Sequence, residues 1–282
     1  MALTKVIGNG LGAVTQDGAA TFNEGSADVD FRIESNNDAN AFFVEGETGN
    51  VAIGTNDPTV QDAGMRMLHI HNSATDGTGR SSLKLTNGDS TLAASRGAII
   101  TLDDAAQLTI GAFESAGKTI FTTGGTTTRV TIDENGIITK PYQPSFLVNP
   151  SSNQNDLAIG TNTNVTIVYG NERYDVGSNF ASNTFTAPVT GKYMLFSQLF
   201  LLNVDKAQTY IQHFLKTSNL TYSNVISNNQ MFSADVDYMT LNQSVVTDMD
   251  ANDTAFVQVN IAGGTQQMDV RTDSFFGGML IG

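Results

Sequence analysis

Two histidines separated by one residue are the pair in this chain whose spacing best suits metal binding. His69 and His71 flank Ile70, and residues i and i+2 of a strand point to the same side. In a parallel bundle of three such strands, six imidazole rings could meet around one metal ion. Leu68 and Ile70 form the competing face of this strand. If that apolar face is buried, both histidines point outward and hold no metal, and this is the arrangement we predict.

Three aspartates in one expected turn suggest a second kind of site. Asp248, Asp250 and Asp253 lie close together in the chain, and clustered carboxylate oxygens are ligands that Ca²⁺ prefers. Their spacing lacks the fixed pattern of a calcium-binding loop. We therefore predict a solvated acidic turn rather than a cation site.

Catalytic motifs are absent from the sequence. His213 alternates with Ile211 and Leu215, which predicts a partly buried strand position. None of the three histidines lies beside a nucleophile-elbow motif, and no phosphate loop or dinucleotide fingerprint occurs. We predict a protein that is not an enzyme and binds no cofactor.

Composition narrows the possible partners. The chain has 282 residues, enough for two domains, and only 15% of them are charged. The net charge of −14 argues against a nucleic-acid partner, because binding a phosphate backbone needs clusters of Lys and Arg. Cysteine is absent, so disulfides and thiolate metal sites are excluded. Residues 1–6 do not look like a signal peptide, and no apolar run is long enough to insert into a membrane.

Short alternating strands separated by turn residues occupy most of the first half of the chain. Residues 28–33 alternate apolar and polar side chains, and residues 41–54 read as a strand, a Gly/Asn turn and a strand. Residues 129–139 repeat this device around Asn135-Gly136, a strong hairpin signal because both turn positions need positive φ. The apolar residues are too sparse for one copy to bury a core. Three copies wound together would bury them, whereas a small sandwich in each monomer is the alternative.

The expected fold is all-β, with three parts. Residues 1–25 read as an attachment arm, with a disordered terminus as the alternative. Residues 26–143 read as a trimeric β-rich shaft, and residues 144–282 as a head built of successive strands. Pro141 and Pro144 mark the junction, because two prolines so close together interrupt strand pairing.

Two motifs in the last part of the chain resemble the globular head shared by the first complement component and the tumour-necrosis-factor superfamily. The first motif runs from Asn179-Phe180 through Phe185, Ala187-Pro188 and Gly191 to Tyr193, Leu195 and Phe196. The second is the closing segment, with Ser274, Phe276, Gly278, Leu280 and Ile281. Where the family usually has an aromatic residue, this chain has Leu195, with Phe196 next to it. The resemblance implies a ten-stranded jelly roll that works as a homotrimer.

The resemblance also implies roles for these residues. Pro188 and Gly191 would shape a turn, and Tyr193 would point into the core. Gly278 would let a neighbouring chain or strand approach closely. The closing strand, apolar as far as Ile281, would be buried in the core.

A further resemblance lies upstream. Residues 49–58, followed by residues 67–70, look like a phrase common in bacteriophage fibre proteins, and residues 1–8 look like the start of structural proteins of aquatic phages. The combination predicts a fibre of the virion. Its arm would bind other virion proteins, and its head would bind a host-surface glycan or outer-membrane protein through loops 203–208, 217–235 and 262–270. A capsid fibre or decoration protein is the alternative. A glycan-degrading spike is disfavoured, because the shaft is short and its acidic residues are scattered.

Overall fold

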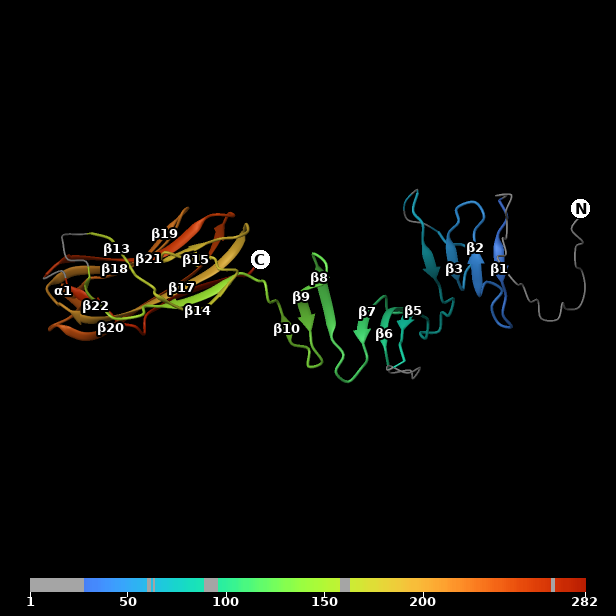
Figure 1. Ribbon diagram of the computed structural model, residues 1–282, viewed down its shortest axis with the longest axis horizontal. Coiled ribbons are helices and arrows are strands. Elements are labelled where there is room, and N and C mark those ends of the chain that lie inside the picture. The colour runs from blue at the N-terminus through green and yellow to red at the C-terminus, as the bar shows by residue number, and fades with distance from the viewer. Residues whose placement is uncertain (1–27, 60–61, 63, 89–95, 158–162, 265–266) are drawn as a thin grey trace, which may run out of the picture. The chain divides into compact units, whose positions relative to one another are not determined.

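The computed structural model describes residues 28–282, apart from residues 60–61, 63, 89–95, 158–162 and 265–266. The predicted attachment arm therefore lies outside the described residues. The chain divides into two compact units, one of residues 1–119 with 133–136, the other of residues 120–132 with 137–282. Apart from one helical turn, α1 (Asn228–Met231), the regular elements of the described part are strands (Figure 1). Within the described ranges, no helix has the length and apolarity needed to cross a membrane.

The first sheet of the first unit has four short strands in the order β1-β2-β3-β4. They are β1 (Phe31–Ile33), β2 (Phe42–Val44), β3 (Val51–Ile53) and β4 (Leu68–Ile70). A turn with Gly49 at φ +70° joins β2 to β3, in agreement with the predicted strand–turn–strand. β4 runs parallel to β3, and the Asn50 side chain accepts a hydrogen bond of 3.1 Å from the Met67 amide at this junction. The buried apolar residues here are Phe43 and Ala52.

The second sheet of this unit is an antiparallel meander, β5 (Arg80–Leu85), β6 (Ala98–Asp103) and β7 (Leu108–Ala112). A third small sheet has the order β10-β9-β8, with β8 (Thr119–Thr123), β9 (Thr127–Ile132) and β10 (Ile138–Thr139). β9 and β10 are the two arms of the hairpin predicted around Asn135-Gly136, with Ile132 opposite Ile138. Gly136 has φ +78°, the positive value expected at this turn position, which glycine adopts without strain.

The C-terminal part is a sandwich of two sheets that share one core (Figure 1). The seven-stranded sheet contains β11 (Ser145–Asn149), β12 (Gln154–Leu157), β14 (Asn171–Val176), β17 (Gly191–Val204), β20 (Val236–Met249), β22 (Met268–Val270) and β23 (Phe275–Leu280). The six-stranded sheet contains β13 (Val165–Thr166), β15 (Phe180–Ala181), β16 (Thr184–Thr186), β18 (Gln208–Thr217), β19 (Thr221–Ile226) and β21 (Thr254–Gly263). The all-β sandwich is confirmed. The described part of the head contains thirteen strands rather than the ten expected, and four of them, β13, β15, β16 and β22, are only two or three residues long.

Alternating side chains of the long strands fill the core. On β17, Tyr193, Leu195, Leu199 and Leu201 are fully buried and point toward the six-stranded sheet. Phe146 lies at the centre of an aromatic cluster, with ring centroids 4.5 Å from Phe185, 4.9 Å from Phe276 and 5.4 Å from Phe180. Burial of several large aromatic rings makes this cluster a major source of the head's stability.

Candidate functional site

The outer face of the seven-stranded sheet is the candidate functional site. β17 alternates buried residues with residues that point away from the core, and this outward set includes Met194, Phe196 and Phe200. β20 pairs with β17 along almost its whole length and forms one edge of the sheet. The outer face therefore spans both 14-residue strands and the shorter strands beside them.

Apolar residues from neighbouring strands form continuous rows across this face. One row places Val246, Met194 and Met279 side by side on β20, β17 and β23. The next row passes from Phe196 on β17 to Gly277 on β23, and then to Leu147 on β11 and Tyr174 on β14. Neither row includes a charged side chain.

Aromatic contacts order the middle of this face. The Phe196 and Phe275 rings meet edge to face with centroids 6.2 Å apart, and the Phe200 and Tyr238 centroids are 6.0 Å apart. A Cβ on Gly277 would lie 2.6 Å from the Phe196 ring. A glycine is therefore needed beneath this ring, because a larger residue would lift it off the sheet.

Much of this face is open to solvent in the single chain. Large apolar side chains on it are substantially exposed: Tyr238 64%, Val246 56%, Tyr174 43%, Met194 38% and Met279 38%. A contiguous exposed apolar patch of this kind marks an interaction surface.

Ion pairs border this face. At one end, Lys192 Nζ lies 2.7 Å from Asp248 Oδ1, and at the other, Arg271 Nε lies 3.0 Å from Asp273 Oδ2. An apolar centre with a polar border is the usual composition of a protein–protein interface.

A side-chain hydroxyl fills a gap in the ladder of β17. This strand pairs with β23 as far as Gln198 and with β22 from Leu201 onward. Between the two partners, the Phe200 amide donates to Ser274 Oγ at 2.8 Å, and the Phe200 carbonyl accepts from the Arg271 amide at 2.9 Å. Ser274, part of the closing motif, is fully buried and replaces a missing backbone acceptor.

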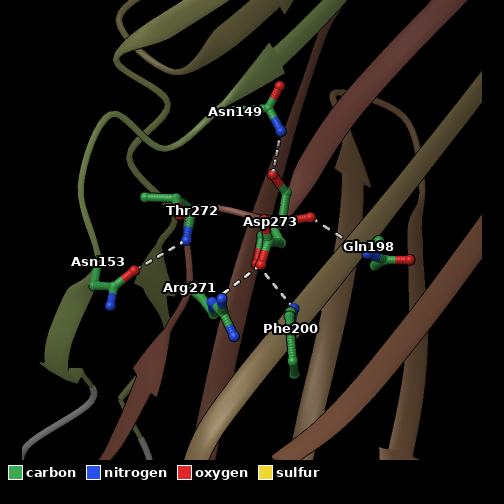
Figure 2. A network of polar contacts seen from close by, with 8 residues as sticks. Asn149, Asn153, Gln198, Phe200, Arg271, Thr272 and Asp273 are labelled. Atoms are coloured by element: carbon green, nitrogen blue, oxygen red, sulfur yellow. Dashed lines mark hydrogen bonds and ion pairs between the residues drawn. The ribbon is translucent and has the colours of Figure 1, made fainter.

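Further hydrogen bonds fix the link between β22 and β23 (Figure 2). Asn149 Nδ2 donates to the Ser274 carbonyl at 2.8 Å, and the Thr272 amide donates to Asn153 Oδ1 at 3.1 Å. Gln198 Nε2 donates to the Asp273 carbonyl at 3.3 Å. Most of these bonds use backbone groups, so the network positions strands rather than a reactive group.

The residues of the first predicted motif lie at one end of the sandwich. Phe185 and Tyr193 are fully buried, and Tyr193 Oη donates a 2.8 Å hydrogen bond to the Val189 carbonyl. This bond holds the turn in which Pro188 lies exposed. A Cβ on Gly191 would lie 2.7 Å from the Gly282 carbonyl oxygen, so this glycine allows the end of the chain to approach β17.

The closing motif lies partly in the core and partly on the surface. Phe276 is fully buried, and a Cβ on Gly278 would lie 2.6 Å from Leu195 Cδ2 and 3.0 Å from Phe146 Cε1. Gly278 thus makes room for core side chains of its own chain. Leu280 packs against the core, but Ile281 is 48% exposed, and its amide donates a 2.8 Å hydrogen bond to the Lys192 carbonyl. The expectation that the chain is buried as far as Ile281 is wrong, because β23 ends one residue earlier.

The orientation predicted for the histidine strand is wrong at Leu68 and His69, whereas Ile70 is half-buried and His71 is exposed as expected. Leu68 is 55% exposed, whereas His69 is half-buried beside Ala52 on the parallel strand β3. The pairing with β3 turns His69 toward the small core, so the apolar Leu68 faces outward. The His69 and His71 ring centroids lie 5.8 Å apart. Within the described part of the chain, no three His, Cys, Asp or Glu residues converge on a possible metal position.

The acidic turn is organised by hydrogen bonds. The Asp253 carboxylate accepts from the Asp250 amide at 2.8 Å, from Ser218 Oγ at 2.8 Å and from Asn219 Nδ2 at 2.6 Å. These donors, the Asp250 amide first, lower the pKa of Asp253. Asp248 instead pairs with Lys192. Asp253 therefore shapes the turn, and the carboxylates do not share a position.

The sequence did not predict that a serine and a histidine form a buried pair. His213 is fully buried rather than partly buried, and its Nε2 lies 2.9 Å from Ser197 Oγ. Burial lowers the pKa of His213 to about 4, so the ring is neutral near pH 7. Both residues lie inside the sandwich, where no substrate can reach them. Their polar positions among alternating apolar residues were the only signal in the sequence.

The predicted contact loops do not all lie at one end of the head. Residues 203–208 meet the segment before β20, where the Lys206 amide donates to Asp235 Oδ1 at 3.0 Å. Gln208 Nε2 also donates to the Gln267 carbonyl at 3.0 Å, which places residues 267–270 at the same end. Residues 217–220 lie at the opposite end, beside Asp253.

Carboxylates surround a hollow at the end of the head where residues 203–208 lie beside Asp235 and Gln267. The hollow has a volume of about 490 Å³ and is lined by Asp156, Asp205, Asp235, Asp237 and Asp269, together with Asn203 and Gln267. Asp269 accepts from the Asn203 side chain at 2.7 Å and from the Asp156 amide at 2.9 Å. This end of the head is therefore strongly acidic.

Comparisons with known proteins concern the C-terminal half. No family model and no curated protein matches the chain. Among solved structures, it is similar to the globular domain of the zebrafish complement 1qA protein, with 15% identity and a TM-score of 0.37 over 50% of this chain and 98% of that chain. It is also similar to murine APRIL at pH 8.5, with 11% identity and a TM-score of 0.35 over 49% of this chain and 99% of that chain.

Proposed function

We propose that this chain is a homotrimeric fibre protein that attaches a bacteriophage to its host cell. The observation that carries the proposal is the exposed apolar outer face of the seven-stranded sheet. Its central rows have no charged side chain, so a second copy of the chain is a suitable partner. The motif from Phe185 to Tyr193, which resembles a family of trimeric heads, supports three copies, and the phrase at residues 49–58 supports a phage fibre.

The proposed activity is binding without turnover. Three identical heads engage a repeated glycan or outer-membrane protein together, so weak single contacts add up to firm attachment. We place the contact surface at the acidic end of the head, around residues 203–208, 227–235 and 267–270. Loops on a rigid sandwich are free to vary in sequence and shape, which suits recognition.

Adsorption to host cells tests this function. Labelled full-length protein is mixed with cells of the bacterium on which the phage grows, and bound label and competition with infection are measured. We expect Asp237→Lys, at the acidic hollow, to reduce adsorption, and Glu172→Lys, an exposed residue of β14, to leave it unchanged. A wild-type protein that neither adsorbs nor competes would refute host attachment.

A capsid fibre or decoration protein is the alternative, because the apolar face fits any trimeric appendage of the particle. Labelled antibody against the chain, viewed on intact virions, separates the two possibilities. Label at the tail supports the attachment fibre, and label distributed over the capsid supports the alternative.

A further inference from the structure

The sheet β5-β6-β7 has an apolar face that is open in the single chain. Its register places Leu83, Ile100 and Ile110 in one row across the three strands. Leu102 and Leu108 form the next row. The large aliphatic residues of this face are all substantially exposed: Leu83 45%, Leu85 60%, Ile100 46%, Leu102 51%, Leu108 66% and Ile110 57%.

The opposite face of the same sheet is more polar and better covered at its centre, although Ile99 also lies on it. Ser82 and Thr101 lie on it with their hydroxyl oxygens 2.8 Å apart, and Thr101 is only 8% exposed. Sheets with one solvated face normally turn the polar face to water. The reverse arrangement here indicates that the aliphatic face is covered in the working protein.

The chemistry of this face restricts what can cover it. Its rows contain aliphatic residues with Ser81, Ala98 and Ala112, and no charged side chain. A nucleic acid or a charged peptide would gain nothing from such a surface, and a flat array of three rows does not enclose a small molecule. The partner must itself offer a flat apolar surface.

The first unit also cannot stabilise itself by its own core. In its described part, the buried apolar side chains are those of Phe43, Ala52 and Pro58. Small isolated sheets of this kind are marginally stable in water. Ile33, Ile53 and Leu68 are exposed on the neighbouring sheet β1–β4, so the need for an apolar partner recurs along the unit. A partner with the same recurring pattern is another copy of this chain.

We propose that the aliphatic face of β5-β6-β7 is a second self-association surface, covered by the same sheet of two further copies around a threefold axis. The proposal rests on the trimer proposed for the head, and it assigns the shaft its own interface. Ile100 lies at the centre of this interface. The polar face with Thr101 remains on the outside of the bundle.

Single cysteine variants test this interface in the full-length protein, because the chain has no cysteine of its own. Ile110→Cys places the thiol on the aliphatic face, and Thr109→Cys, one residue earlier, places it on the polar face. Both positions are exposed in the single chain. We expect maleimide to label Ile110→Cys roughly tenfold or more slowly than Thr109→Cys, because labelling would require the bundle to open. Under mild oxidation, Ile100→Cys should form disulfide-linked dimers.

The solution mass of each variant separates the possible outcomes. A mass three times that of the 30.0 kDa chain with a protected Ile110→Cys supports the inference. A threefold mass with equal labelling of both variants overturns it and leaves the head trimer intact. A single-chain mass with both thiols reactive overturns the shaft interface and the proposed trimer together. A single-chain mass with a protected thiol would show that the face is covered within one chain, which also overturns the inference.

Discussion

At the scale of single residues, His213 makes the stability of the head depend on pH. Its imidazole is fully buried with Nε2 2.9 Å from Ser197 Oγ, and burial lowers its pKa from 6.5 to about 4. The unfolded chain therefore binds a proton between about pH 6.5 and pH 4 that the folded chain does not. The stability contributed by the neutral ring is complete above pH 6.5 and is lost as the pH falls toward 4.

Replacement of His213 should remove this dependence. A shift of this size corresponds to about 3 kcal/mol of unfolding free energy across the window. We expect wild-type protein to lose stability between pH 6.5 and pH 4 more steeply than His213→Gln. Urea unfolding at several pH values and one fixed protein concentration measures both slopes. Equal slopes would show that His213 does not remain neutral in the folded head.

Glycines of the closing strand illustrate what residue types alone can reveal. Gly278 was predicted to allow close approach, and the side chains that approach it are Leu195 and Phe146 of the same chain. Gly277, which the predicted motif passed over, lies beneath the Phe196 ring on the outer face. A glycine in a strand indicates that other atoms approach its backbone closely. Which atoms these are is determined by strand pairing between residues distant in sequence.

At the scale of elements, β17 depends on a side chain where it changes partner. Ser274 Oγ accepts the Phe200 amide between the part of β17 paired with β23 and the part paired with β22. Ser274→Ala would leave this amide without its acceptor. A buried donor without a partner costs about 1–3 kcal/mol.

Thermal unfolding measures this effect. We expect a lower melting temperature for Ser274→Ala, whereas Ser223→Ala, at an exposed position of β19 in the other sheet, should leave it nearly unchanged. Serine-to-alanine changes are the same in both variants, so intrinsic strand propensity is controlled. Identical melting temperatures would mean that another group, or water, satisfies the Phe200 amide.

The elements themselves were largely predictable, but their orientation was not. Alternation along residues 28–33 predicted a strand, and Asn135-Gly136 predicted a hairpin, because both signals are local. Alternation also shows which residues share a face. It does not show which face is covered, and for this reason Leu68 was placed inside and His69 outside. That choice is made by the parallel pairing of β4 with β3, which joins residues distant in sequence.

The candidate site was likewise only partly predictable from local sequence patterns. The motif residues Phe185 and Tyr193 pointed to the sandwich, and they belong to its core. The exposed apolar rows on its outer face arise only when β20, β17, β23 and β11 lie side by side. Tyr238 and Met279, which carry much of this exposure, lie 41 residues apart by their numbers and had no common signal.

At the scale of the whole molecule, the two apolar faces make the assembly testable. One lies on the head and includes Met194, and the other lies on β5-β6-β7 and includes Ile110. They belong to different compact units, so each can be disrupted without direct damage to the other. A charge introduced into the head face should therefore act on the head interface alone.

Met194→Lys is the change that tests the head interface. Met194 is 38% exposed in the single chain and lies in the row between Val246 and Met279, so a lysine there fits the monomer. In a trimer it would be a buried charge without a partner, which is strongly destabilising. We expect light scattering to show dissociation at dilutions where the wild-type mass is unchanged.

Val225→Lys, 51% exposed on β19 of the other sheet, is the matched control and should keep the wild-type mass. If both lysine variants dissociate alike, general charge repulsion in the head is responsible. If neither does, the outer face of the seven-stranded sheet is free in the assembly, and the proposed trimer must be held elsewhere.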